Sequence, residues 1–139
     1  MRSDCPLSYA LDFFGDKWSL LVIRDMIFEG KRFFNEFRQS KERIATNILS
    51  SRLKKLEAIG IVESRVYPQL KTKKEYRLTA KGIDLIPVLV EMIAWSAKYQ
   101  AGLAVTDDFL VKLNQDREGV LAIIRSNSKE RYAVSDSAD

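Results

Sequence analysis

A change of periodicity at Gly60 restricts the fold more than any other feature of this chain. Before it, apolar residues recur at helical spacing and predict a helix over residues 46–59. After it, residues 61–67 and 74–78 alternate and are rich in β-branched side chains, which predicts two strands. The connection between the strands is basic. The pattern therefore predicts an α+β fold, mostly helical, with a two-stranded β-hairpin.

The remaining chain has further helical patterns. Helices are expected over residues 7–14, 17–29 and 32–38, and a longer one from Ala80 with a kink at Pro87. The apolar face of this long helix exceeds what one small domain needs, so C-terminal dimerisation helices are expected, although simple core packing explains the face as well. The expected interface residues are Leu7, Leu11, Leu89, Ile93, Trp95 and Tyr99.

Three segments follow from these patterns. Residues 5–100 are expected to form a winged helix-turn-helix domain together with its dimerisation helices. Residues 103–126 form a C-terminal helical extension. The polar residues 127–139 are expected to be a disordered tail.

Composition argues against an enzyme. The chain has no histidine and a single cysteine, Cys5, so a Ser-His-Asp triad, most zinc sites and an internal disulfide are excluded. We find no glycine-rich phosphate loop, and we therefore expect no catalytic residues, no metal and no cofactor. No apolar run is long enough for a membrane span and the N-terminus lacks a signal-type segment, so no membrane partner and a cytoplasmic location are expected.

Positive charge gathers in one segment. The whole chain carries a net charge of +4, but residues 41–81 alone carry eleven basic and four acidic groups, whereas residues 1–40 are balanced and residues 82–139 are acidic. A local basic excess is typical of a surface that binds a phosphate backbone. Charge by itself is also compatible with an ordinary solvated surface.

A helix pair followed by a basic hairpin suits duplex DNA. The second helix fits the major groove, the short helix over residues 32–38 braces it, and the hairpin, or wing, reaches the flanking phosphates. Asn47 can pair with adenine, and Arg52 has a second interpretation as a support of the fold. The candidate DNA-binding residues are Thr46, Asn47, Ser50, Ser51, Arg52, Lys54, Lys55, Lys71, Lys73 and Lys74. The alternative, a winged-helix module that binds protein, predicts a neutral or acidic surface there.

The chain also resembles the HxlR family of bacterial winged-helix regulators, which is related to the MarR type. The resemblance covers about residues 5–100. The matching stretches are Cys5-Pro6, Gly15-Asp16-Lys17-Trp18, Phe34-Asn35-Glu36-Phe37, Ile48-Leu49-Ser50-Ser51-Arg52-Leu53-Lys54-Lys55-Leu56, Gly60-Ile61-Val62, Tyr67-Pro68 and Tyr76-Arg77-Leu78-Thr79-Ala80-Lys81-Gly82. It implies a homodimeric regulator that binds a double-stranded DNA operator.

The chain departs from the family pattern at three places. Ala45 stands where a serine often opens the recognition helix, so Thr46 is expected to cap it instead. Phe33 replaces a common arginine, and Lys71-Thr72-Lys73-Lys74 replaces a proline-rich wing segment. These changes predict a more basic and more flexible wing.

Cys5 has two interpretations. The resemblance implies that the cysteine of the N-terminal Cys-Pro pair can respond to oxidants or electrophiles. Cys5 has no cationic neighbour in sequence, and Asp4 disfavours its thiolate, so an inert packed residue is the alternative. A small-molecule effector is a further open partner; an aromatic pocket for it would use Phe14, Trp18, Trp95 or Tyr99, which equally suit a plain core.

Overall fold

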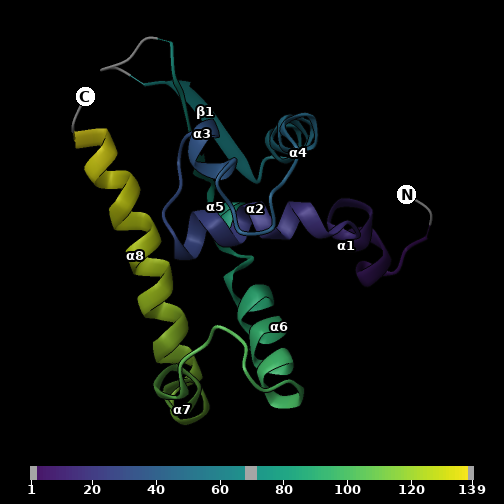
Figure 1. The fold of residues 1–139 in the computed structure, drawn as a ribbon, viewed down its shortest axis with the longest axis vertical. Coiled ribbons are helices and arrows are strands. Elements are labelled where there is room, and N and C mark those ends of the chain that lie inside the picture. The colour runs from purple at the N-terminus through teal and green to yellow at the C-terminus, as the bar shows by residue number, and fades with distance from the viewer. Residues whose placement is uncertain (1–2, 68–71, 138–139) are drawn as a thin grey trace. The chain divides into compact units, whose positions relative to one another are not determined.

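The computed structural model describes residues 3–67 and 72–137 (Figure 1). It divides into two compact units, residues 1–82 and 83–139. The first unit contains α1 (Pro6–Phe14), α2 (Lys17–Phe28), α3 (Phe34–Phe37), α4 (Thr46–Ala58), β1 (Val62–Val66) and β2 (Lys74–Leu78). The short α5 (Ala80–Ile83) leads into the second unit, which contains α6 (Ile86–Tyr99), α7 (Asp107–Gln115) and α8 (Arg117–Ser137). The predicted α+β class, mostly helical with a two-stranded hairpin, is confirmed.

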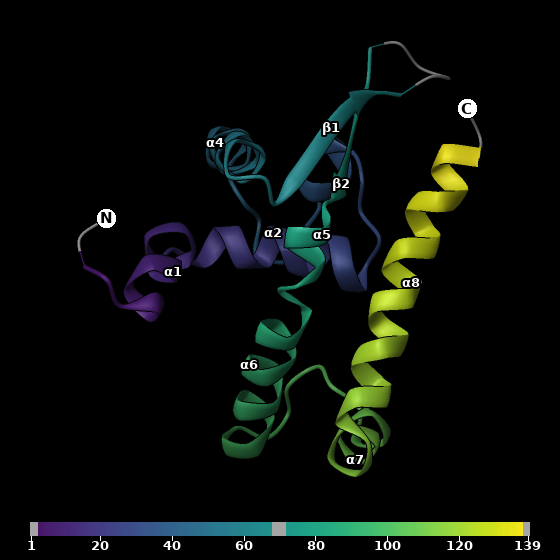
Figure 2. The same ribbon diagram turned by 180° about the vertical axis from the view of Figure 1, so that it is seen from behind.

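The core of the first unit forms around α2. Asp16 caps this helix by accepting hydrogen bonds from the backbone N–H groups of Trp18 and Ser19. Its apolar side chains pack against α4 and β2, and both views show α4 beside the hairpin (Figures 1 and 2). The buried apolar residues of these elements are Val22, Ile23, Met26, Ile27, Phe37, Leu49, Leu53, Leu56, Val62 and Leu78.

The hairpin is antiparallel. Its register runs from Val62 opposite Leu78 to Val66 opposite Lys74. The segment ahead of α3 joins the sheet, because Phe33 forms a bridge with Glu75 and the Tyr76 N–H donates to the Arg32 carbonyl at 2.7 Å. This backbone pairing fixes the base of the wing to the helix pair.

The expected kink at Pro87 is wrong. α5 ends at Ile83, and α6 begins at Ile86 with Pro87 in its first turn. Proline is well tolerated there because the N–H groups of a first turn have no partner within the helix. The residue therefore starts a helix instead of bending one.

The C-terminal residues differ from the expected disordered tail. α8 continues to Ser137, so residues 127–137 are helical. Once α8 has begun, each added residue extends an existing hydrogen-bonded helix at little cost, and Lys129, Glu130 and Arg131 are good helix formers. The boundary between compact units also lies ahead of α6, whereas the sequence-based division placed it after this helix. Within the described residues, no helix is long and apolar enough to cross a membrane.

Candidate nucleic-acid interface

α4 is amphipathic, with a polar outer face. Leu49, Leu53 and Leu56 are buried on its inner face. Four of the predicted DNA-binding residues are exposed on the outer face, and a fifth, Ser50, is half-buried. The four are Thr46, Asn47, Ser51 and Lys54. This arrangement agrees with the face that the sequence predicted.

The N-terminus of α4 has no side-chain cap. Ala45 is the N-cap residue and Thr46 is the first helical residue, so the expectation that Thr46 caps the helix is wrong. The reason is a shift of the helix start by one residue. A cap must precede the helix in extended conformation, and here that position belongs to Ala45.

Arg52 and Lys55 point toward the junction of α1 and α2. Arg52 Nε donates to Asp16 Oδ1 at 3.0 Å, and Lys55 Nζ donates to Asp16 Oδ2 at 3.1 Å and to the Phe13 carbonyl at 2.6 Å. Burial alone would raise the pKa of Asp16, but hydrogen bonds from Arg52, Ser19 and Lys55 outweigh it and hold this pKa well below its usual range. Two predicted DNA contacts are thus bonded within the fold.

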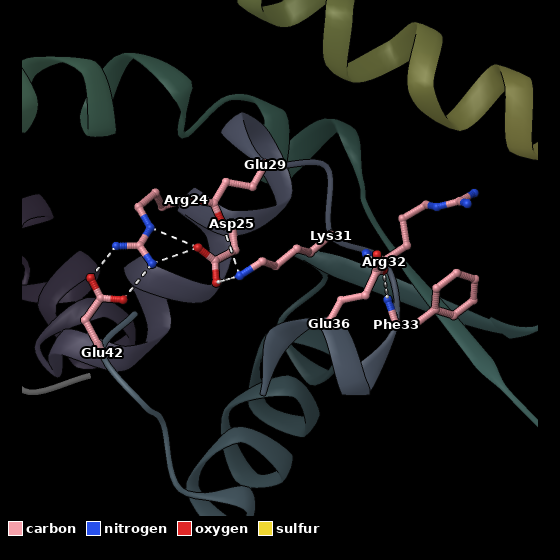
Figure 3. A network of polar contacts seen from close by, with 8 residues as sticks. All are labelled: Arg24, Asp25, Glu29, Lys31, Arg32, Phe33, Glu36 and Glu42. Carbon is pink, nitrogen blue, oxygen red and sulfur yellow. Dashed lines mark hydrogen bonds and ion pairs between the residues drawn. The ribbon is translucent and has the colours of Figure 1, made fainter. Parts of the chain in front are cut away.

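The turn before α4 is held by a polar network (Figure 3). Arg24 donates to both carboxylate oxygens of Glu42, at 2.6 and 2.8 Å, and also to Asp25, which is almost fully buried. Lys31 bonds to the other oxygen of Asp25 at 3.2 Å. The hydrogen bonds from Arg24 lower the pKa of Glu42 to about 2. The network ties the end of α2 to the turn that leads into α4.

The wing presents its lysines at the far end from the core. Lys73 and Lys74 are exposed, and Lys71 lies outside the described residues. Lys73 Nζ lies 5.0 Å from the centroid of the Phe33 ring, which also packs edge-on against Tyr67. Phe33, the residue that replaces an arginine of the family pattern, thus packs against both ends of the wing loop.

A buried carboxylate anchors the wing. Glu75 is fully buried and bonds to Arg32 Nη1 at 2.7 Å and to Arg65 Nε at 3.0 Å. Sequence reasoning missed this cluster and also the role of Asp16. The available signal was the single acid in the second basic strand, because a hairpin of this register places Arg65 directly opposite Glu75.

About half of the basic segment is therefore structural. Arg52, Lys55 and Arg65 are bonded as described, Arg77 pairs with Glu63 at 2.9 Å, and Lys81 donates to the Ile59 carbonyl at 2.7 Å. Exposed basic residues remain in the turn before α4, on α4 and on the wing. They are Lys41, Arg43, Lys54, Lys73 and Lys74.

Two helices carry exposed apolar faces. On α1, Leu7 and Leu11 are 68% and 49% exposed. On α6, Trp95 and Tyr99 are each 68% exposed, and Ile93 is half-buried. Leu89 differs from the other predicted interface residues: it is only 5% exposed in the single chain, so it belongs to the core.

Cys5 is a free, exposed thiol at the N-cap position of α1. Its backbone N–H donates to Ser3 Oγ at 3.2 Å, and its carbonyl accepts from the Tyr9 N–H. Exposure contradicts the inert, packed alternative, because the thiol is open to reagents and to a second chain.

The second unit has two cavities. One of about 240 Å³ is lined by Met92, Ile93, Ser96 and residues 103–105, and one of about 370 Å³ lies between α6, α7 and the start of α8. Neither includes the aromatic residues that we expected around an effector. Among the described residues, no group of three or more potential ligands is placed to hold a metal ion.

Known proteins resemble this chain over the same region. Residues 13–103 match the HxlR-like helix-turn-helix family. YdeP of Bacillus subtilis (strain 168), an uncharacterized HTH-type transcriptional regulator, is 38% identical over 96 residues, which are 69% of this chain and 74% of YdeP. YodB of the same organism, another HTH-type transcriptional regulator, is 35% identical over 68% of this chain and 85% of its own length. These relatives are regulators and not enzymes.

Solved structures give the same result. The redox regulator HypR in its oxidized form has a TM-score of 0.62 and 38% identity, covering 70% of this chain and 100% of that chain. The reduced form of the transcriptional regulator YodB from B. subtilis has a TM-score of 0.58 and 36% identity, covering 71% of this chain and 97% of that chain.

Proposed function

Because the chain belongs to the HxlR-like helix-turn-helix family of transcription regulators, we propose that it binds a specific DNA operator as a homodimer. The observation that carries this proposal is the outer face of α4. Its exposed short polar side chains lie opposite a buried leucine face, and the exposed lysines of the wing follow in the same compact unit. A helix of this kind fits the major groove, about 12 Å wide, where side chains reach base edges.

The residues divide into two groups by role. Asn47 reads bases, with Thr46, Ser50 and Ser51 contacting bases or phosphates around it. Lys54 and the wing lysines Lys71, Lys73 and Lys74 bind phosphates, which contribute affinity but little sequence preference. Arg52 and Lys55 act from behind, because their cationic groups are bonded to Asp16.

A footprint on DNA upstream of the protein's own gene, followed by binding measurements, tests this assignment. Asn47→Ala should reduce the preference for one base pair by roughly 10-fold. Lys54→Ala should weaken binding to all sequences alike and flatten the salt dependence by about 0.9 in the log–log slope. Lys129→Ala on α8 is the control and should change neither. Binding by the unmodified protein that ignores sequence at physiological salt contradicts the proposal.

Dimerisation is supported by the exposed apolar side chains of α1 and α6. On α6 the residues Val88, Met92, Trp95 and Tyr99 are all exposed, and their spacing of four, three and four places them along one side of the helix. A second copy covers such a stripe without any new partner. Two copies then present two α4 helices to an operator with two-fold symmetry.

We further propose that Cys5 makes binding responsive to oxidants. It is exposed and is the chain's single cysteine, so any disulfide must join it to a second molecule. Diamide takes up two electrons and two protons from two thiols, which leaves an intersubunit disulfide. The cross-linked species should run at twice 16.0 kDa on a non-reducing gel, and the Cys5→Ser variant should lose both the cross-link and the change in operator affinity. An unchanged response of this variant excludes the proposal.

A further inference from the structure

We infer that Asp16 is a positioning residue for DNA recognition: by holding Arg52 and Lys55, it sets the orientation of α4 against the junction of α1 and α2. The inference rests on the proposed function and deepens it. Asp16 itself lies on the far side of these two cations from the residues proposed to contact DNA, so its effect on binding is indirect.

The geometry around Asp16 uses both carboxylate oxygens. Oδ1 accepts the Trp18 and Ser19 N–H groups at 2.9 and 3.0 Å and the Arg52 guanidinium at 3.0 Å. Oδ2 accepts the Ser19 hydroxyl at 2.8 Å and the Lys55 ammonium at 3.1 Å. One carboxylate therefore caps α2 and binds two successive turns of α4. Charge-assisted bonds of this length fix orientation as well as position.

Lys55 extends the connection to α1. Its ammonium donates to the Phe13 carbonyl at 2.6 Å, near the end of α1. All nine residues of α1 keep part of their surface exposed, so this helix has little packing of its own to hold it. The polar link through Lys55 therefore fixes α4 relative to the helix that carries Leu7, Leu11 and Cys5.

The same bonds also keep two cations away from DNA. Arg52 and Lys55 follow and precede residues of the outer face along α4, so without Asp16 their long side chains are free to turn toward phosphates. Released cations increase affinity for any sequence and do not increase the preference for one. Asp16 thus favours specific over non-specific binding in two ways.

The test compares Asp16→Asn with the unmodified protein on operator and on scrambled DNA. Asparagine caps helices as well as aspartate does, so α2 keeps its N-cap while the negative charge is lost. We expect the operator Kd to rise by roughly 10-fold, as for the loss of one base contact. The Kd for scrambled DNA should stay the same or fall, and its salt dependence should steepen by about 0.9 for each cation that reaches a phosphate.

A role in stability alone gives a different result. It lowers the fraction of folded protein and raises both Kd values by one factor, which overturns the inference, as does an unchanged operator Kd. Asp108→Asn on α7 is the matched control: it removes the same charge from an exposed pair with Lys112 and should leave both Kd values unchanged.

A second variant approaches the contact from the other side. Arg52→Met with Lys55→Met keeps apolar stems but removes both cations, and it should lose the preference for the operator without a steeper salt dependence. It also provides the test if Asp16→Asn fails to fold. An unmodified protein with no preference for the operator overturns the proposed function together with the inference. A preference that both variants retain overturns the inference alone.

Discussion

Arg43, in the turn before α4, has a backbone conformation that side chains other than glycine rarely adopt. Its φ is 57°, and its N–H donates to the Ser40 carbonyl at 3.0 Å. The left-handed region costs an L-residue about 1–2 kcal/mol, part of which glycine returns through its freer unfolded chain. We therefore expect Arg43→Gly to raise the free energy of unfolding by about 0.5–1 kcal/mol, as measured by urea denaturation. Lys41→Gly in the same turn should give no gain; equal effects of the two variants reject the argument.

Glu42 next to it makes the turn sensitive to acid. Hydrogen bonds from Arg24 lower its pKa from 4.5 to about 2, so the folded state binds a proton less readily than the unfolded chain. The resulting stability is fully present above about pH 4.5 and is lost as the pH falls toward 2. Glu42→Gln should flatten the decline of the urea midpoint over that range. Glu118→Gln on α8 is the control, and an unchanged profile for Glu42→Gln would falsify the assignment.

Among the elements, the hairpin depends most on a single side chain. Glu75 is buried between Arg32 and Arg65, so Glu75→Gln leaves two partly buried cations without their carboxylate. Breaking a buried ion pair in this way costs about 3 kcal/mol, whereas an exposed pair contributes about 0–1 kcal/mol. Glu63→Gln on β1 removes the exposed partner of Arg77 and is the matched control. Similar losses of unfolding free energy in both variants contradict the anchoring role.

Local patterns explain which elements were predictable. α4 and the hairpin follow from periodicities of 3.6 and 2 that a dozen residues are enough to display. Pro87 was misjudged because the same residue starts a helix or bends one, depending on where the helix begins. The partners of Arg52 and Lys55 were out of reach for a different reason: Asp16 lies 36 and 39 residues away, and charge alone does not specify a distant partner.

At the scale of the whole molecule, apolar surface left uncovered in one chain points to a second. Trp95 and Tyr99 are each 68% exposed, and their rings lie 5.7 Å apart, centroid to centroid. Large aromatic side chains at the centre of an interface commonly contribute 2 kcal/mol or more to binding, about 30-fold in the dissociation constant. Their exposure in a transcription regulator of this family is best explained by contact with a partner copy.

Trp95→Lys tests this directly. A cation at this position has to be desolvated in the interface, so we expect the dimer to dissociate at micromolar concentrations in analytical ultracentrifugation. Operator affinity should fall with it, because two linked half-site contacts become independent ones. Ile123→Lys on α8, at a site 62% exposed and off the α6 stripe, should remain dimeric and bind normally. A folded Trp95→Lys protein that stays dimeric at the same concentration would show that α6 does not form the interface, and would leave the exposed face of α1 as the surface to test next.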